Sequence, residues 1–249
     1  MLRGSRPAAI FFDVGDTLVR AHPSWPAVYA SVLPEFGIEV GADELDAAWR
    51  EAFVNWSLEG PFEASEEASY QRFKELDGRI FARLGYPDLP DEFFRAIEVA
   101  FSRRSSWFVF DDVVPALDAL RQAGFRLGVI SNWGWAAPEL LHDLQLAAHF
   151  EALTISARVG FQKPRPEIFR HALEQLDVRP QEALHVGDSY AADVLGARAT
   201  GMGVVLIDRD KGERGHGTLE TDPGVPVVRD LLELLDLLGL PRPADVARH

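Results

Sequence analysis

The stretch "IFFDVGDTLV", from Ile10 to Val19, places two aspartates three positions apart directly after a short apolar run. Such a run of Ile and Phe is typical of a buried strand, and Asp13 and Asp16 stand where that strand would end. On this stretch alone, a glycine-centred turn with polar flanks explains "DVGDT" equally well. Whether these carboxylates do chemistry depends on the rest of the chain.

Polar side chains also follow three later apolar segments. These are Ser131 and Asn132 after "LGVI", Lys163 after "ISARVGFQ", and Asp188 and Asp193 after "LHVG". Since parallel strands end on the same side of a sheet, we expect these groups to converge with Asp13 in one crevice.

Carboxylates, a lysine and a small hydroxyl around one point suit a particular chemistry. Carboxylates that close together repel each other unless a cation lies between them. Mg²⁺ prefers oxygen ligands, so one or two carboxylates and a backbone carbonyl suit it. A lysine and a hydroxyl or amide can hold phosphoryl oxygens while a carboxylate attacks to form an acyl-phosphate.

Two kinds of periodicity divide the chain. Residues 20–107 carry apolar residues at spacings of three and four, which predicts helices and no convincing strand. From residue 109 onward, amphipathic helices alternate with short apolar strands, among them "FRLGVISN", "EALTISARVG", "EALHVGD" and "GVVLIDR". This alternation predicts an α/β fold, a Rossmann-like doubly wound parallel sheet that also includes the first strand.

The order of these segments predicts an insertion. Residues 1–19 and 108–240 would form the α/β core, residues 20–107 an all-helical cap inserted into one loop, and residues 241–249 a frayed tail. Active sites lie at the carboxyl ends of parallel strands, so the insert is expected to cover the site like a lid. The Gly-rich segment 210–226 is interpreted as a surface loop rather than a phosphate cradle.

Composition excludes several functions. The 249 residues are 47% hydrophobic and carry a formal charge of −14, so a folded core is expected, and nucleic acids and anionic membranes would be repelled. Without cysteine there is no thiolate catalysis and no Cys-ligated metal. No signal peptide or membrane span is visible, and a cytoplasmic protein is expected.

Four motifs, in order, resemble those of the haloacid dehalogenase (HAD) superfamily of hydrolases. They are "DVGDTL", "GVISN", "KPRPEIF" and "HVGDSYAAD", and the resemblance covers nearly the whole chain. It implies a HAD-like core whose helical insert is a type C1 cap. The activity it implies is Mg²⁺-dependent hydrolysis, by a phosphatase-like route through an aspartyl-phosphate, of a small phosphorylated molecule.

Carried onto this sequence, the resemblance implies a role for each polar residue. Asp13 would be the nucleophile and a metal ligand, with the Gly15 carbonyl and Asp188 as further ligands and Asp193 close behind. The remaining roles are phosphate binding by Ser131 and the backbone amide of Asn132, charge neutralisation by Lys163, and support of the first loop by Thr17.

One position departs from the phosphatase pattern. Such enzymes carry a second aspartate two positions after the nucleophile, as general acid and base, and here that position holds Gly15. General acid–base catalysis is typically worth 10²–10⁴-fold, so slow ester hydrolysis and a preference for acidic leaving groups, as in acyl or aryl phosphates, are expected.

Other readings stay open. One is a weak or inactive member that serves as a ligand-binding or protein-binding scaffold. Another is a dehalogenase or phosphonatase, although a dehalogenase does not need the fourth motif, and Lys74, the only lysine of the insert, carries no mark of a Schiff-base residue.

Several residues have ordinary explanations. Asp16 is interpreted as a turn-stabilising residue, His185 as a satisfied core histidine, and Trp25, Trp56 and Phe62 as the insert's own core. Trp133 and Trp135 would suit a substrate contact, buried packing or a subunit contact, so a homodimer also stays open.

Overall fold

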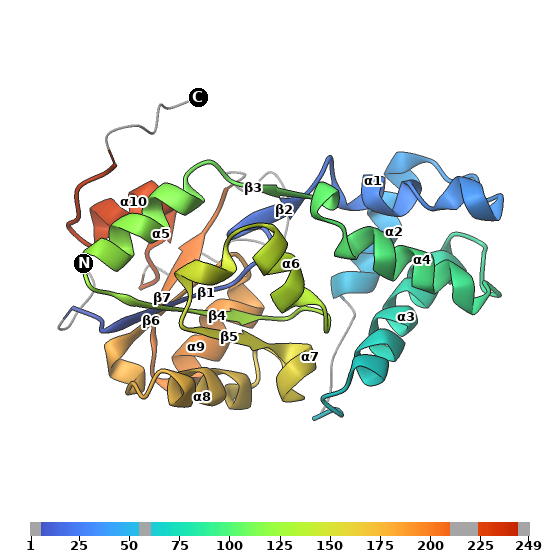
Figure 1. Ribbon diagram of the computed structural model, residues 1–249. Helices are drawn as coiled ribbons and strands as arrows, with labels where there is room; N and C mark the ends of the chain where they lie inside the picture. Colours follow the sequence, from blue (N-terminus) through green and yellow to red (C-terminus); the bar gives the residue numbers. More distant parts are fainter. Residues whose placement is uncertain (1–5, 55–60, 210–223, 244–249) are drawn as a thin grey trace.

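The computed structural model describes residues 6–54, 61–209 and 224–243 (Figure 1). Trp56, most of the loop predicted over 210–226 and most of the 241–249 tail lie outside the described residues.

Six parallel strands form the central sheet, in the order β5-β4-β1-β6-β7-β8. They are β1 (Ala9–Phe12), β4 (Arg126–Ser131), β5 (Ala152–Ile155), β6 (Ala183–Gly187), β7 (Gly203–Ile207) and β8 (Val227–Val228). In the middle of the sheet, Phe12 of β1 is in register with Val129 of β4 and Val186 of β6. The doubly wound, Rossmann-like sheet predicted from the sequence is confirmed.

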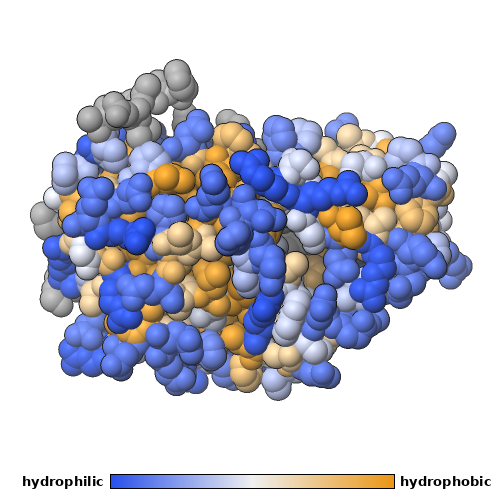
Figure 2. All heavy atoms as spheres, in the orientation of Figure 1, coloured by the Kyte–Doolittle hydropathy of each residue, from blue (hydrophilic) through white to orange (hydrophobic). Residues whose placement is uncertain are grey.

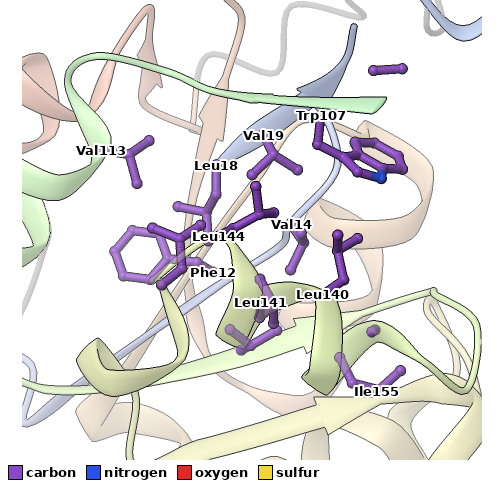
Figure 3. Close-up of a cluster of buried hydrophobic side chains, with 14 of the residues drawn as sticks. Phe12, Val14, Leu18, Val19, Trp107, Val113, Leu140, Leu141, Leu144 and Ile155 are labelled. Atoms are coloured by element: carbon purple, nitrogen blue, oxygen red, sulfur yellow. The ribbon is translucent and has the colours of Figure 1, made fainter. Parts of the chain in front are cut away.

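Both faces of the sheet are covered, which is why its strands read as unbroken apolar runs. Side chains of β1 alternate between the faces: Ile10 and Phe12 join one core cluster, Ala9 and Phe11 the other. The first cluster includes residues of α5 (Val113–Gln122), α6 (Ala137–Asp143) and α10 (Leu231–Leu237), and part of it is shown in Figure 3. The second includes α8 (Pro166–Gln175) and α9 (Leu195–Thr200), on the opposite face in Figure 1.

The insert between β1 and α5 is mainly helical. It contains α1 (Trp25–Ala30), α2 (Ala42–Val54), α3 (Glu66–Arg83) and α4 (Asp91–Ser102), with 3₁₀ turns η1 (Leu33–Phe36) and η2 (Arg104–Ser106). Its helices enclose aromatic packing, such as Phe81 against Phe93 with ring centroids 4.7 Å apart. In Figure 1 the four helices lie at one end of the core, past the end of β1.

Short elements depart from the predictions. The statement that residues 20–107 contain no strand is wrong at both ends, because β2 (Val19–Ala21) and β3 (Trp107–Val109) pair as an antiparallel ribbon that leads into and out of the insert. The segment "EALTISARVG" is a strand only to the end of β5, after which α7 (Ser156–Val159) begins. Strand β8, with two residues, was not predicted.

Hydrophilic side chains predominate on the face of the molecule shown in Figure 2, over both the core and the insert. Among the helices of the described residues, none is both long enough and apolar enough to cross a membrane.

Candidate active site

Asp13 lies at the meeting point of neighbouring strand ends. It directly follows β1, and its backbone N–H donates to the Val186 carbonyl of β6 at 2.9 Å. Its Oδ1 accepts from Ser131 Oγ, at the end of β4, at 2.8 Å, and lies 2.6 Å from Lys163 Nζ. Segments far apart in the sequence therefore bring a carboxylate, a hydroxyl and an ammonium group together.

Lys163 reaches this point by a different path from the one predicted. It does not follow a strand, because α7 and a turn at Gly160 separate it from β5. The Asn132 side chain fixes its backbone: Lys163 N–H donates to Asn132 Oδ1 at 2.7 Å, and Asn132 Nδ2 donates back to the Lys163 carbonyl at 2.9 Å. Asn132 thus positions the lysine, while the predicted phosphate contact of its backbone amide stays a prediction.

Asp193 is fully buried and holds the other side of the lysine. Its Oδ1 lies 2.6 Å from Lys163 Nζ and accepts from His185 Nε2 at 2.8 Å, and its Oδ2 accepts from the Ser189 N–H at 3.0 Å. The carboxylate lies directly against the end of β6, where a Cβ on Gly187 would stand 2.2 Å from Asp193 Cγ. His185 is therefore more than a core histidine, because it helps to orient a site carboxylate.

Burial and charge act on these groups in opposite directions. Burial disfavours the charged form of Lys163, but Asp13 and Asp193 outweigh it and raise the pKa of the lysine. Burial likewise opposes ionisation of Asp193, yet Lys163 and His185 hold its pKa well below the usual range. The pKa of Asp188 is raised well above its ordinary value by burial and by the charges of Asp13, Asp193 and Asp16. A cation beside Asp188 would relieve this repulsion.

The carboxylates are spaced for a metal ion. Ligand atoms of Asp13, Asp188 and Asp193 lie within 4.8 Å of one another. Both oxygens of Asp193 already accept hydrogen bonds or contact Lys163, so Asp13 and Asp188 are better placed to bind a cation. An oxygen-only donor set fits a hard divalent ion such as Mg²⁺.

Gly15 faces aromatic rings. A Cβ built on it would lie 3.3 Å from Trp133 Cζ3 and 4.0 Å from Trp25 Cζ2. Trp107 joins the two rings, with its centroid 5.1 Å from Trp25 and 4.7 Å from Trp133. This tryptophan cluster (Trp25, Trp107 and Trp133) lies where the side chain of a second aspartate would point.

Asp16, next in the chain, has the left-handed φ of 50° that suits a turn. Its Oδ2 accepts from Trp25 Nε1 of the insert at 3.3 Å, so the carboxylate turns toward the insert. Trp25 also stacks on Trp49, with centroids 5.5 Å apart, and so belongs both to the insert's core and to the edge of the site.

The loop after Asp13 has a support that sequence reasoning missed. The Thr17 carbonyl accepts from Arg209 Nε at 2.9 Å, and the same guanidinium is paired with Asp112 at 2.9 and 3.1 Å. Among the described residues, the buried Thr17 hydroxyl has no hydrogen-bond partner. Thr17 therefore links the first loop to Arg209 through its backbone, and no local sequence signal identified that arginine.

Comparisons with known proteins show which family the chain belongs to. A family model described as haloacid dehalogenase-like hydrolase matches residues 7–201. The chain belongs to this family. It is therefore a hydrolase of the haloacid dehalogenase-like family, as the sequence predicted.

Relatives of this haloacid dehalogenase-like hydrolase match most of its length. The mouse (Mus musculus) haloacid dehalogenase-like hydrolase domain-containing protein 3 is 30% identical and covers 93% of this chain and 95% of its own. A phosphoserine phosphatase from Thermus thermophilus is 29% identical over 80% of this chain and 88% of its own. The crystal structure of a HAD phosphatase from Thermococcus onnurineus has a TM-score of 0.63 and 28% identity, covering 94% of this chain and 99% of that one.

Proposed function

We propose that this hydrolase is a Mg²⁺-dependent phosphatase that acts on a small phosphorylated molecule through an aspartyl-phosphate at Asp13. The observation that carries the proposal is the buried contact of Asp13 Oδ1 with Lys163 Nζ at 2.6 Å and with Ser131 Oγ at 2.8 Å, with Asp188 in the same carboxylate cluster.

The reaction would proceed in two displacements. A carboxylate oxygen of Asp13 attacks the phosphorus, the ester P–O bond breaks, and the leaving oxygen takes the electron pair. Water then attacks the phosphorus of the aspartyl-phosphate and gives up a proton to the solvent. The P–O bond to Asp13 breaks with its electron pair on the carboxylate, which releases inorganic phosphate and restores Asp13. Lys163 would neutralise charge on both partners, and Ser131 with the Asn132 backbone amide would hold the phosphoryl oxygens.

Asp13, Asp188 and the Gly15 carbonyl would hold the magnesium ion. When bound, Mg²⁺ supplies positive charge that offsets repulsion between the carboxylates and the phosphoryl oxygens. Asp193 would act on the lysine rather than on the metal, because its oxygens are already engaged by Lys163, His185 and the Ser189 N–H.

The leaving group would determine the rate. Gly15 lies beside the tryptophan cluster and supplies no carboxyl group at the position of the second aspartate. Leaving groups that depart as stable anions need no proton, so acyl and aryl phosphates are the substrates we expect to react fastest.

Two rival functions rest on the presence of Gly15 in place of the second aspartate. A scaffold that binds a ligand or a protein without turnover is favoured by the tryptophan cluster at Gly15. A dehalogenase or phosphonatase is less favoured, because the clustered carboxylates suit a cation and Lys74 Nζ contacts Asp91 Oδ1 of the insert at 2.5 Å.

The remaining assignments are proposals of the same kind. The helical insert (20–107) would be a type C1 cap over a core of residues 1–19 and 108–240, and the protein would work in the cytoplasm, without nucleic-acid or membrane partners, as a monomer or a homodimer.

Phosphate release from acetyl phosphate and p-nitrophenyl phosphate tests the proposal. Release should require Mg²⁺, stop with EDTA, vanish in Asp13→Asn, and persist in Asp143→Asn, which changes an exposed aspartate of α6. Turnover that survives Asp13→Asn would contradict the proposal. No release with retained ligand binding would favour the scaffold, and metal-independent halide release from a haloacid would favour the dehalogenase.

A further inference from the structure

A narrow crevice separates the first half of α3 from the core beside the candidate active site. Its volume is about 10 Å³, room for about one water molecule. The insert lines it with Phe62, Arg72 and Phe73, and the core with Asn132, Trp133 and Gln162. Asn132 follows Ser131 and binds the backbone of Lys163, and Gln162 directly precedes that lysine, so the crevice lies beside the segments that carry these two site residues.

Three hydrogen bonds close this crevice. Phe62 N–H donates to the Gly160 carbonyl at 3.0 Å, Trp135 N–H donates to Ser69 Oγ at 3.0 Å, and Arg72 Nη2 donates to Gln162 Oε1 at 3.1 Å.

Gly160 permits this close approach. It has a φ of 77°, and a Cβ there would stand 2.6 Å from the Phe62 carbonyl oxygen. The backbone of Phe62 therefore lies against the core, whereas its ring contacts Arg72 of the insert.

Arg72 has the features of an anion-recognising group. Its guanidinium carbon lies 3.6 Å from the centroid of the Phe62 ring, and the side chain points from the insert to the core amide of Gln162. Burial lowers the pKa of Arg72, and the charge of Glu75 partly offsets this. A guanidinium stacked on an aromatic ring keeps its donor edge in the plane, which matches the two oxygens of a carboxylate.

We propose that Arg72 recognises a carboxylate on the leaving-group side of the substrate, so that this enzyme prefers phosphorylated carboxylates. This inference rests on the proposed function of the adjoining site. A carboxylate would replace the neutral Gln162 oxygen as acceptor, and a charged acceptor makes a stronger hydrogen bond to a guanidinium. The water-sized volume means that α3 must move away from the core for the substrate to enter.

Two phosphonates of equal length test this role without turnover. In the presence of Mg²⁺, calorimetry on the full chain would compare 3-phosphonopropionate, which carries a carboxylate, with propylphosphonate, which does not. The wild type should bind 3-phosphonopropionate about tenfold to a hundredfold more tightly. In Arg72→Ala this ratio should fall to near one, and in Arg72→Lys to an intermediate value, because charge remains and the planar fork is lost.

Arg79→Ala provides the matched control. Arg79 lies two turns further along α3, is exposed, and pairs with Glu75, so its loss should leave the ratio unchanged. Equal binding of both phosphonates by the wild type would overturn the inference. An Arg72→Ala variant that weakens the binding of both phosphonates equally would also overturn it, because that result is expected if Arg72 only holds α3 against the core. Failure of the proposed function would appear separately, as absent phosphate release with the binding ratio intact.

Discussion

Restoring the second aspartate is expected to raise phosphatase activity only when space is made for it. Gly15→Asp alone places a Cβ 3.3 Å from Trp133 Cζ3, closer than most Cβ contacts, so the ring must shift by a few tenths of an ångström. Trp133 cannot shift easily, because its ring packs on Trp107 and its backbone N–H donates to Ser156 Oγ at 3.1 Å. The useful variant is therefore Gly15→Asp combined with Trp133→Leu.

The size of the gain follows from the chemistry of proton donation. A positioned general acid contributes about 10²–10⁴-fold, or about 3–5 kcal/mol of transition-state stabilisation. An introduced carboxyl would lie against Trp25, and such apolar surroundings raise a carboxyl pKa, which favours a proton donor near neutral pH. We expect about a hundredfold gain from the double variant and tenfold or less from Gly15→Asp alone.

Substrates with different leaving groups reveal the origin of any gain. The assay compares kcat/KM for glycerol phosphate, whose alkoxide needs a proton, with that for p-nitrophenyl phosphate, whose phenolate does not. The control is Gly15→Asn with Trp133→Leu, which has the same shape and no acid. The increase in kcat/KM should appear for glycerol phosphate and not for p-nitrophenyl phosphate. Equal gains on both substrates, or the same gain in the asparagine control, would refute the missing-acid account.

Three further predictions concern buried charges. Burial raises the pKa of Asp77 to about 7, so its proton stabilises the fold at low pH and this contribution is lost as the pH rises from about 4 to about 7. Asp77→Asn keeps an acceptor for the Tyr29 hydroxyl. The variant should therefore match the wild type in stability near pH 4 and be more stable at pH 8, by about 4 kcal/mol at most. Urea unfolding at both pH values measures this, and the same stability difference between variant and wild type at the two pH values would contradict it. Lys163→Met should lower the free energy of unfolding by about 3–5 kcal/mol, since it leaves buried carboxylates without their cation, and a loss below about 1 kcal/mol in denaturant titration would contradict the buried contact. Arg209→Lys should raise the activation free energy obtained from kcat more than it lowers the free energy of unfolding, because it loosens the loop at the Thr17 carbonyl. An unchanged kcat would show that this contact does not position the loop.

The features predicted well from the sequence are those set by local patterns. The alternation of apolar strands and amphipathic helices predicted the sheet, because both faces of each strand are buried. Because parallel strands end at the same edge of a sheet, Asp13 and Ser131 were expected to lie side by side there. In the structure Ser131 Oγ lies 2.8 Å from Asp13 Oδ1.

Short elements escaped prediction. Strands β2 and β3 have three residues each, and β2 has a charged residue, Arg20, at its centre. Such strands form because they pair with each other across the base of the insert, a long-range contact that periodicity cannot reveal.

The parts of the site that were missed depend on packing between distant segments. Trp133 was singled out, but its approach to Gly15 depends on how the loop after β4 packs beside the first loop. The contacts of Arg72 with Gln162 and of Arg209 with Thr17 also depend on packing between distant segments, because they join residues about 90 and 192 positions apart. His185 carried a weak signal, a titratable residue within an apolar strand, whose partner Asp193 appears only when the chain turns back after β6.

Trapping the covalent intermediate tests the central claim most directly. Wild-type protein mixed with acetyl phosphate and Mg²⁺, quenched in acid and digested, would be searched by mass spectrometry for a phosphoryl group. We expect the phosphoryl group on the peptide that contains Asp13, and its absence in Asp13→Asn. Turnover with no phosphorylated peptide, or with the phosphoryl group on another residue, would contradict it.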